Sequence, residues 1–418
     1  MIRNSFLLSV LLLLTLSAAA QTQDSIDVDV PPPPGMDYPL DSLLNEWHAR
    51  NTLTPSADCD TLVGIPTYPD SVYIDRLSRI PAIMEMPYND IVRRFIDMYT
   101  TGRARRQVPF MLGAANFYMP IFEEALDAYN VPLELRYLPI IESALNPSAV
   151  SRAGASGLWQ FMLQTGRLYG LDSNSLIDER RDPIKASWAA ARYLKDLYDI
   201  YGDWYLVIAA YNCGPGNVNK AIRRANGKAD YWAIYNYLPR ETRGYVPAFI
   251  AANYVMTYYC KHNICPMETD IPLATDTIQV SQNIHFQQIA ALCGISVDQI
   301  KSLNPQYRRD IIPGQTKPQT LRLPHNAISA FIDRQDSIYT YRRDELFKNR
   351  SVVAVPDRGR GSSVAVPGDG TPVTYRIRSG DNLGSIARRY GVTVSQLQRW
   401  NGIVGTAIRA GKTLKIYR

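Results

Sequence analysis

Leu138-Pro-Ile-Ile-Glu142-Ser-Ala-Leu-Asn-Pro147 places one carboxylate inside an otherwise apolar segment of the 418-residue chain. In a helix, Glu142 would share a face with Leu138 and Leu145, and Pro147 would end that helix within two turns. Desolvation and the helix dipole both disfavour a charged carboxylate in that position. We therefore predict a raised pKa for Glu142, as a general acid at neutral pH requires. The alternative is a glutamate that simply reaches solvent at a helix end.

The next informative segment is Ser151-Arg-Ala-Gly-Ala-Ser-Gly157-Leu-Trp-Gln-Phe-Met162. Its glycines and small residues allow the backbone to approach another group closely, as the wall of a cleft requires. Trp159, Gln160 and Met162 would add a stacking face, an amide and an adaptable apolar group. The alternative is an ordinary turn that enters a core helix.

The middle of the chain has the periodicity of helices. From about residue 89 to 259 apolar residues recur at helical spacing, and few stretches alternate as strands do. Asp182-Pro183 is a favourable helix start, and Gly202 ends the same helix. We predict an all-α domain at residues 85–265.

The C-terminal third contains an internal duplication of the order β-α-α-β. Strands are predicted at 277–280 and 320–323, with helices at 286–292 and 297–303 between them. The same order recurs with strands at 375–377 and 414–416 and helices at 383–390 and 394–400. The predicted fold class is therefore multidomain α+β, with modules at 273–325 and 373–418. A helical extension and a flexible Pro/Gly/Ser/Arg-rich linker at 326–372 would connect them.

The first eighty residues indicate export. Arg3, an apolar run and Ala18-Ala19-Ala20 predict a signal peptide at residues 1–20, cleaved before Gln21. Residues 21–84, with prolines at 31–34, predict a poorly structured lead-in that acts as a stiff extended tether.

Composition excludes several classes of protein. Hydrophobic residues at 46% and charged residues at 20% exclude wholesale disorder, and a net charge of +6 is too small to indicate nucleic-acid binding. Four scattered histidines offer little material for a metal centre, so we expect no metal and no cofactor. Cys260 and Cys265 are close to each other in sequence. They either form a disulfide or remain plain thiols.

Four motifs occur in order: Glu142-Ser143, Gly157-Leu-Trp-Gln-Phe161, Ala210-Tyr-Asn212 and Leu238-Pro-Arg-Glu-Thr-Arg-Gly-Tyr-Val-Pro247. Together they resemble the motifs of the soluble-type lytic transglycosylases, and the two repeats resemble LysM peptidoglycan-binding modules. The resemblance implies a lysozyme-like catalytic domain with Glu142 as its only catalytic acid and base. It also implies a substrate-binding set, namely Ser143, Ser151, Gly157, Trp159, Gln160, Phe161, Met162, Tyr211, Asn212, Glu241 and Tyr245.

The implied reaction needs one carboxylate where ordinary glycosidases use two. Glu142 would protonate the glycosidic oxygen between N-acetylmuramic acid and N-acetylglucosamine, then deprotonate the muramic acid 6-hydroxyl as it closes on C1. The product would be a 1,6-anhydro ring. Asp172, Asp178 and Glu179 could supply a second carboxylate, but we expect them to be solvated loop and cap residues.

The C-terminal repeat matches the LysM opening, so Gly380, Asp381, Asn382 and Leu383 are its expected glycan-binding residues. The first repeat carries Ser281-Gln-Asn-Ile284 instead, so we interpret it as a degenerate LysM module that either binds glycan or serves as a structural spacer.

The expected partner is the glycan strand of peptidoglycan, bound by an exported monomer in the periplasm or cell envelope. A peripheral association with the envelope membrane is compatible with this location. The alternatives are a catalytically silent wall-binding scaffold and a hydrolytic muramidase.

Overall fold

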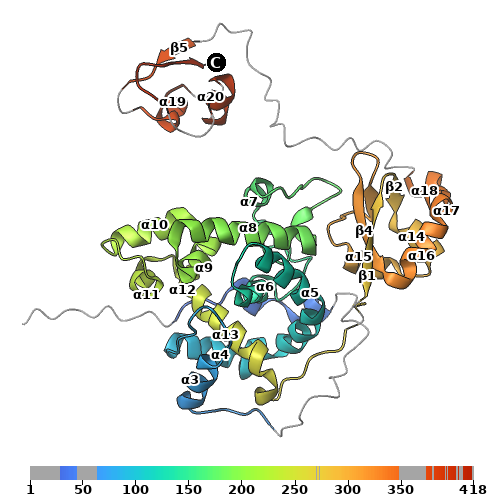
Figure 1. Cartoon of the computed structure of the whole chain (residues 1–418), viewed down its shortest axis with the longest axis horizontal. Helices are drawn as coiled ribbons and strands as arrows, with labels where there is room; N and C mark the ends of the chain where they lie inside the picture. The colour runs from blue at the N-terminus through green and yellow to red at the C-terminus, as the bar shows by residue number, and fades with distance from the viewer. Residues whose placement is uncertain are drawn as a thin grey trace, which may run out of the picture. The chain divides into compact units, whose positions relative to one another are not determined.

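The computed structural model has two compact units, divided between residues 353 and 354 (Figure 1). The first is described over residues 29–44, 64–269, 271–272 and 274–347. The second is described over 373–378, 381–390, 392, 394–401, 403 and 408–416. The predicted signal peptide and most of the predicted linker lie outside the described residues.

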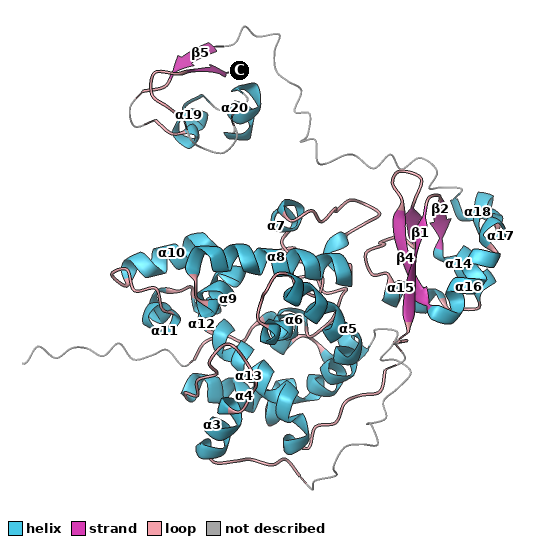
Figure 2. Ribbon diagram, in the orientation of Figure 1, coloured by secondary structure: helices cyan, strands magenta, loops and turns pink. Residues whose placement is uncertain are grey.

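Helices make up most of the first unit (Figure 2). Up to residue 168 they are η1 Pro34–Asp37, α1 Leu40–Leu44, α3 Asp70–Ser78, α4 Asp90–Thr100, η2 Arg103–Gln107, α5 Val108–Ala128, η3 Leu133–Tyr137, α6 Leu138–Ser143 and α7 Leu163–Leu168. They continue with η4 Glu179–Arg181, α8 Pro183–Tyr201, α9 Trp204–Cys213, α10 Pro215–Arg224, α11 Tyr231–Ile234, η5 Tyr235–Tyr237, α12 Arg240–Arg243, α13 Tyr245–Tyr258 and η6 Tyr259–His262. The predicted helical character of this part of the chain is confirmed.

The ends of α8 follow the prediction from sequence. The Asp182 side chain accepts hydrogen bonds from the backbone N–H groups of Ile184 and Lys185, and Gly202 ends the helix with a left-handed φ of 63°. Helix α8 packs against α5 and α9. Helix α13 is apolar on all sides and packs against α4, α6 and α9, which makes it the central helix of the core.

The segment before residue 85 corrects the prediction of an extended tether. Val30, Met36 and Leu43 are buried in the main core, and so are Tyr73 and Leu77 of α3. Helix η1 packs on α6 so closely that a Cβ at Gly35 would lie 2.1 Å from the Ile140 carbonyl oxygen. The proline run therefore begins a segment that packs against the helix carrying Glu142.

The first repeat forms a small module with its own core. Strand β1 Thr275–Val280 pairs antiparallel with β4 Gln319–Pro324, and β2 Asn283–His285 pairs with β3 Ile311–Pro313. Helices α14 Phe286–Cys293 and α15 Val297–Leu303 lie between them in sequence, as predicted. Phe331 of α16 His325–Asp333 and Ile338 of α17 Gln335–Thr340 share this core, so the module extends beyond residue 325. Helix α18 Arg343–Phe347 follows.

The second unit has the predicted β-α-α-β order. Strand β5 Val373–Arg376 pairs antiparallel with β6 Thr413–Ile416, and helices α19 Leu383–Tyr390 and α20 Val394–Asn401 lie between them in sequence. Tyr375, Leu383, Ile386 and Leu397 are among the residues of its separate core.

The structure distinguishes between the two cysteines at residues 260 and 265. Cys265 is disulfide-bonded whereas Cys260 is a free thiol, so a bond between these two is excluded.

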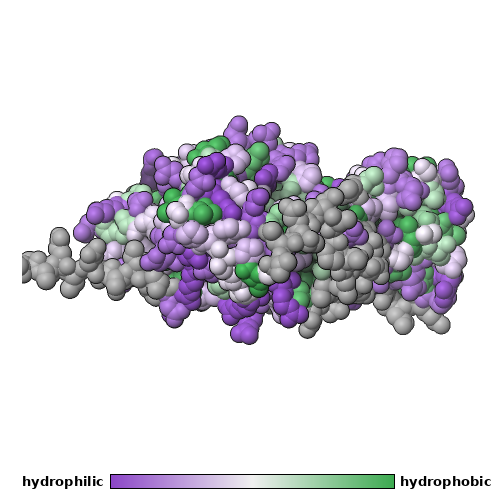
Figure 3. Space-filling model, turned by 90° about the horizontal axis from the view of Figure 1, so that it is seen from below, coloured by the Kyte–Doolittle hydropathy of each residue, from purple (hydrophilic) through white to green (hydrophobic). Residues whose placement is uncertain are grey.

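The face drawn in Figure 3 is mostly hydrophilic, and its apolar residues occur in small patches. None of the helices in the described part of the chain has the length and apolar character that a membrane span requires.

Candidate active site around Glu142

Glu142 lies in the last turn of α6, and its side chain is enclosed. The helix ends at Ser143 because Ala144 and Leu145 adopt left-handed φ values of 51° and 60°. Leu145 therefore lies outside the helix. The prediction that Pro147 ends the helix is wrong, because the helix has already ended at Ser143. Glu142 is only 6% exposed, and this burial raises its pKa to about 8. The predicted pKa shift is present, with desolvation as its cause.

Tyr245, the first residue of α13, contacts the Glu142 carboxyl. Its hydroxyl donates to Glu142 Oε2 at 3.4 Å, and this bond opposes the effect of burial on the pKa of Glu142. The pKa of Tyr245 is itself well above its ordinary value, because of burial first and the Glu142 charge second. Tyr245 therefore remains a neutral donor beside the carboxyl.

The loop at residues 149–162 is tightly bonded within itself. Ser156 N donates to the Phe161 carbonyl at 3.1 Å, and Gly157 N donates to the Ala149 carbonyl at 2.9 Å. Ser151 closes its own turn, since its Oγ accepts from Ala155 N at 3.0 Å. The predicted close approach is at Gly157, where a Cβ would lie 1.9 Å from the Arg180 carbonyl oxygen.

Ser143, Trp159 and Phe161 of the implied substrate-binding set are buried in the core. Ser143 Oγ donates to the Leu158 carbonyl at 2.9 Å. Trp159 is 0% exposed, and its indole N–H donates to Ser187 Oγ. Phe161 is 2% exposed. The structure corrects the prediction of a stacking face at Trp159, because the ring is fully packed against other side chains.

Gly157 and Tyr245 are buried as well, whereas the remaining members of the set are partly or fully accessible. Met162 is 45% exposed, Glu241 on α12 is also exposed, and Gln160 is half-buried with its amide donating to the Gly157 carbonyl. Asn212 at the end of α9 accepts from Thr242 Oγ1 at 2.8 Å. Tyr211 donates its hydroxyl to the Trp159 carbonyl at 2.7 Å. The charge of Glu142 contributes, after burial, to raising the pKa of Tyr211, so these two side chains lie near each other.

A tyrosine cluster beside Tyr211 was not predicted. The ring of Tyr193 lies 5.3 Å from that of Tyr211 and 5.0 Å from that of Tyr169. Tyr193 comes from α8 and Tyr169 follows α7, so residues far apart in sequence converge on the motif tyrosine. The 27 tyrosines of the chain were the available signal, but composition alone could not select these.

Asp178 and Glu179 are not solvated, contrary to expectation. Asp178 forms ion pairs with Arg180 and Arg308, and Glu179 pairs with Lys185 at 2.5 Å. Both carboxylates are buried. Asp172 is exposed, as expected, and pairs with Lys317 at 3.2 Å.

The LysM opening in the second unit is held by its own side chains. The Asp381 carboxylate accepts from the Tyr375 hydroxyl at 2.6 Å and from Arg378 N at 2.8 Å, and Asn382 Oδ1 accepts from Ser385 N. Leu383 is buried in the core of the unit. Gly380 lies outside the described residues.

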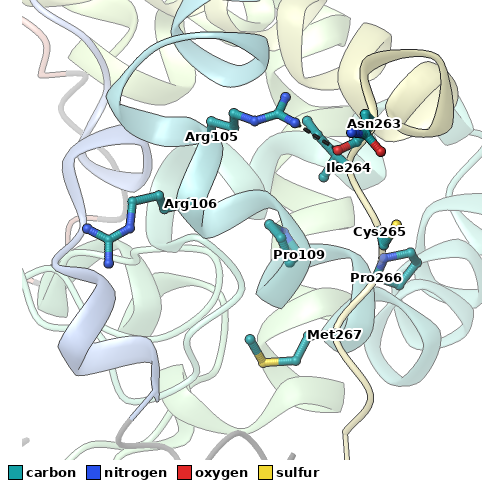
Figure 4. A pocket seen from close by; sticks show the side chains of 8 residues that line it. All are labelled: Arg105, Arg106, Pro109, Asn263, Ile264, Cys265, Pro266 and Met267. Atoms are coloured by element: carbon teal, nitrogen blue, oxygen red, sulfur yellow. Dashed lines mark hydrogen bonds between the residues drawn. The ribbon is translucent and has the colours of Figure 1, made fainter. Parts of the chain in front are cut away.

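A separate pocket of about 390 Å³ lies between η2 and the segment after η6 (Figure 4). Its lining residues are Arg105, Arg106, Pro109, Asn263, Ile264, Cys265, Pro266 and Met267. None of them belongs to the predicted site. Arg105 donates to the backbone carbonyls of His262 and Asn263, which fixes this part of the chain. Within the described residues, no cluster of His, Cys, Asp or Glu could hold a metal ion.

Comparison with family models defines the class of protein. The model for the transglycosylase SLT domain matches residues 119–234. The model for the LysM-like domain of lytic transglycosylase MltD matches residues 274–340, and the general LysM model matches 375–416. The helical domain is thus a lysozyme-like SLT domain, followed by two LysM-type modules.

Comparison with individual relatives shows to which family within this class the chain belongs. Membrane-bound lytic murein transglycosylase D of Escherichia coli strain K12 is 33% identical over 340 residues, which are 80% of this chain and 70% of the relative. The chain therefore belongs to the family of membrane-bound lytic murein transglycosylase D. The soluble lytic murein transglycosylase of the same strain is 33% identical over 124 residues, 28% of this chain and 19% of that protein.

A solved structure also matches part of the chain. The 70 kDa soluble lytic transglycosylase from Escherichia coli is 26% identical to it, with a TM-score of 0.32. The match covers 40% of this chain and 28% of the solved chain.

Proposed function

We propose that the protein is a peptidoglycan lytic transglycosylase. It cleaves the bond between N-acetylmuramic acid and N-acetylglucosamine without water and leaves 1,6-anhydro ends. Glu142 acts as its single acid and base. Membership of the family supports the activity, and the environment of Glu142 supports the role of this residue.

The observation that carries the proposal is the contrast between Glu142 and the other buried carboxyl groups. Five carboxyl groups are buried in the described part of the chain, at residues 134, 142, 178, 179 and 182. Four of them accept from a backbone N–H group or a cation. Among the residues that the structure describes, only the Tyr245 hydroxyl donates to Glu142. It is therefore the buried carboxyl best suited to hold a proton at neutral pH.

The Glu142 carboxyl takes part in both halves of the reaction, first as the acid and then as the base. Glu142 first donates it to the glycosidic oxygen, which leaves as the hydroxyl of N-acetylglucosamine. The resulting carboxylate then accepts the proton of the muramic acid 6-hydroxyl while that oxygen bonds to C1. The attack is intramolecular, so it avoids the entropic cost of positioning a free water molecule. Tyr245 stays hydrogen-bonded to the carboxyl during both steps.

The remaining parts of the proposal concern location and binding. The family membership and the leader sequence support an exported enzyme of the cell envelope, with the signal peptide at residues 1–20. The C-terminal LysM module at 373–418 would bind peptidoglycan strands. We propose that the enzyme is a monomer, in peripheral contact with the envelope membrane, and that it uses no cofactor.

Digestion of purified sacculi, followed by mass spectrometry of the products, tests the proposed activity. We expect muropeptides that are lighter than hydrolysis products by one water and that resist borohydride reduction. Reducible ends would instead establish a hydrolase. Binding to sacculi without any release of products would establish a scaffold.

The pH dependence of the rate should report the titration of Glu142. Because only the protonated form can donate, we expect kcat/KM to fall as the pH rises through about 8, the pKa of Glu142. Tyr245→Phe removes a hydrogen bond that favours the carboxylate, so the pKa should rise and the alkaline limb should move to higher pH.

A second tyrosine of α13 provides the matched control for this measurement. The Tyr258 hydroxyl donates to the Arg76 carbonyl at 2.9 Å, and Tyr258→Phe should leave the alkaline limb unchanged. A limb that moves to lower pH in Tyr245→Phe would contradict the assigned interaction.

A further inference from the structure

The LysM-like module contacts the catalytic domain through residues that are well separated in sequence from the segment that connects the two. Asp178 N donates to the Gln306 carbonyl, and Arg308 N donates to the Leu176 carbonyl, each at 2.8 Å. The Ile177 side chain, which belongs to the catalytic domain, is buried in the core of the module. This interface therefore combines backbone pairing with a shared apolar residue.

A buried ion cluster reinforces the same interface. The Asp178 carboxylate is 0% exposed and accepts two bonds from the Arg180 guanidinium, at 2.8 and 2.9 Å. Arg308 of the module donates to the same carboxylate. Burial alone would raise the pKa of Asp178, but the bonds from Arg180 and Arg308 outweigh it and hold the pKa below its ordinary value. Asp178 is thus ionised, and both arginines stabilise its negative charge.

Arg180 connects this cluster to the loop at residues 149–162. Its Nη1 donates to the Gly154 carbonyl at 2.8 Å and to the Phe161 carbonyl at 2.9 Å. Its own carbonyl oxygen lies against Gly157. One side chain therefore fixes two points of the loop while its remaining donors bind Asp178.

The loop in turn contacts the surroundings of Glu142. The Leu158 carbonyl accepts from Oγ of Ser143, the residue directly after Glu142. The Trp159 carbonyl accepts from the Tyr211 hydroxyl. Hydrogen bonds on both sides of the loop, joined through the backbone of the loop itself, therefore link Arg308 to the residues beside the proposed acid.

We propose that the LysM-like module at 274–340 is an integral part of the catalytic unit, and that its Arg308 acts through Asp178 and Arg180 as a positioning residue for the loop at 149–162. This inference rests on the proposed function and assigns the first repeat a role other than independent glycan binding. Loss of Arg308 leaves a buried carboxylate with one cation in place of two. Arg180 already bonds Asp178 through Nε and Nη2, and it then has to compensate this carboxylate without Arg308. A shift of its guanidinium toward the carboxylate weakens the bonds from Nη1 to the loop.

The test compares three variants of the full chain. In Arg308→Gln we expect kcat on sacculi to fall by about tenfold or more with little change in KM, since misplacement of positioning groups slows the chemical step. Arg308→Lys keeps the charge but lacks the planar fork and should recover part of the rate. The control is Lys317→Gln, which breaks an exposed ion pair with Asp172 between the same two parts and should leave the rate unchanged.

Hydrogen exchange provides a readout that does not depend on activity. The amides of Ser156 and Gly157 are bonded within the loop, and their exchange should be about tenfold faster in Arg308→Gln than in the wild type. Exchange in the second unit should be unchanged. Arg308→Lys supplies the same comparison at smaller amplitude if the glutamine variant fails to fold.

The outcomes separate this inference from the proposed function. A wild type that releases no anhydro products contradicts the proposed function, whereas the exchange comparison still tests the coupling. An active wild type with Arg308→Gln unchanged in both kcat and loop exchange overturns the inference alone. A rise in KM without a fall in kcat also overturns it and indicates direct glycan binding by the module.

Discussion

Replacing Glu142 by glutamine, Glu142→Gln, is expected to slow the release of anhydro muropeptides by about a thousandfold or more. Glutamine keeps the shape of the side chain but can neither donate a proton to the glycosidic oxygen nor accept one from the 6-hydroxyl, so both halves of the reaction lose their catalyst. The measurement is the initial rate of product release from sacculi. Binding of the variant to sacculi should remain close to that of the wild type.

Glu134→Gln is the matched control for this substitution. Glu134 is another buried glutamate at 6% exposure, and it accepts from Met84 N at 2.7 Å. A glutamine oxygen can accept the same bond, so activity should be retained. Cleavage by Glu142→Gln within tenfold of the wild-type rate would remove Glu142 from its assigned role.

The same variant has an expected effect on stability. The pKa of Glu142 is raised in the folded chain, so its stabilising contribution is complete below about pH 4.5 and is lost as the pH rises toward 8. Glutamine does not titrate. The melting temperature of Glu142→Gln relative to the wild type should therefore increase between pH 5 and pH 8.

Gly157→Ala should have the largest effect on stability. Gly157 has a φ of 86°, and a Cβ there would lie 1.9 Å from the Arg180 carbonyl oxygen, a backbone atom that cannot turn away. Strain and overlap together should lower the free energy of unfolding by about 3 kcal/mol or more. Displacement of Arg180 should also reduce activity. Urea unfolding and sacculus digestion measure the two effects.

Gly154→Ala separates the overlap from the backbone strain. Gly154 has the same φ of 86°, but a Cβ there would have no neighbour within 4 Å. Its cost should be about 1 kcal/mol, from the left-handed conformation alone. Equal losses in the two variants would show that the approach of Gly157 to Arg180 is unimportant.

The sequence predicted those features that depend on local patterns. Helix α8 follows from its Asp182 cap and Gly202, and the strand pairs follow from alternation and duplication. The raised pKa of Glu142 also follows from a carboxylate among apolar residues. Each of these signals lies within a few residues of the feature that it predicts.

Long-range contacts account for the errors. Helix α6 ends at Ser143, before Pro147, and the segment around Gly35 packs against it from more than a hundred residues away in sequence. No local pattern shows that Trp159 would bond Ser187 in the core. Asp178 resembled a loop residue because its second cation, Arg308, belongs to another module.

The most direct test of the account is the origin of the oxygen at the new glycan end. Sacculi are digested in water enriched in the heavy oxygen isotope, and the released ends are analysed by mass spectrometry. If the muramic acid 6-hydroxyl is the nucleophile and Glu142 its base, the new ends carry no heavy oxygen and are anhydro sugars. Heavy oxygen in newly formed reducing ends would show attack by water and would contradict the single-carboxylate mechanism.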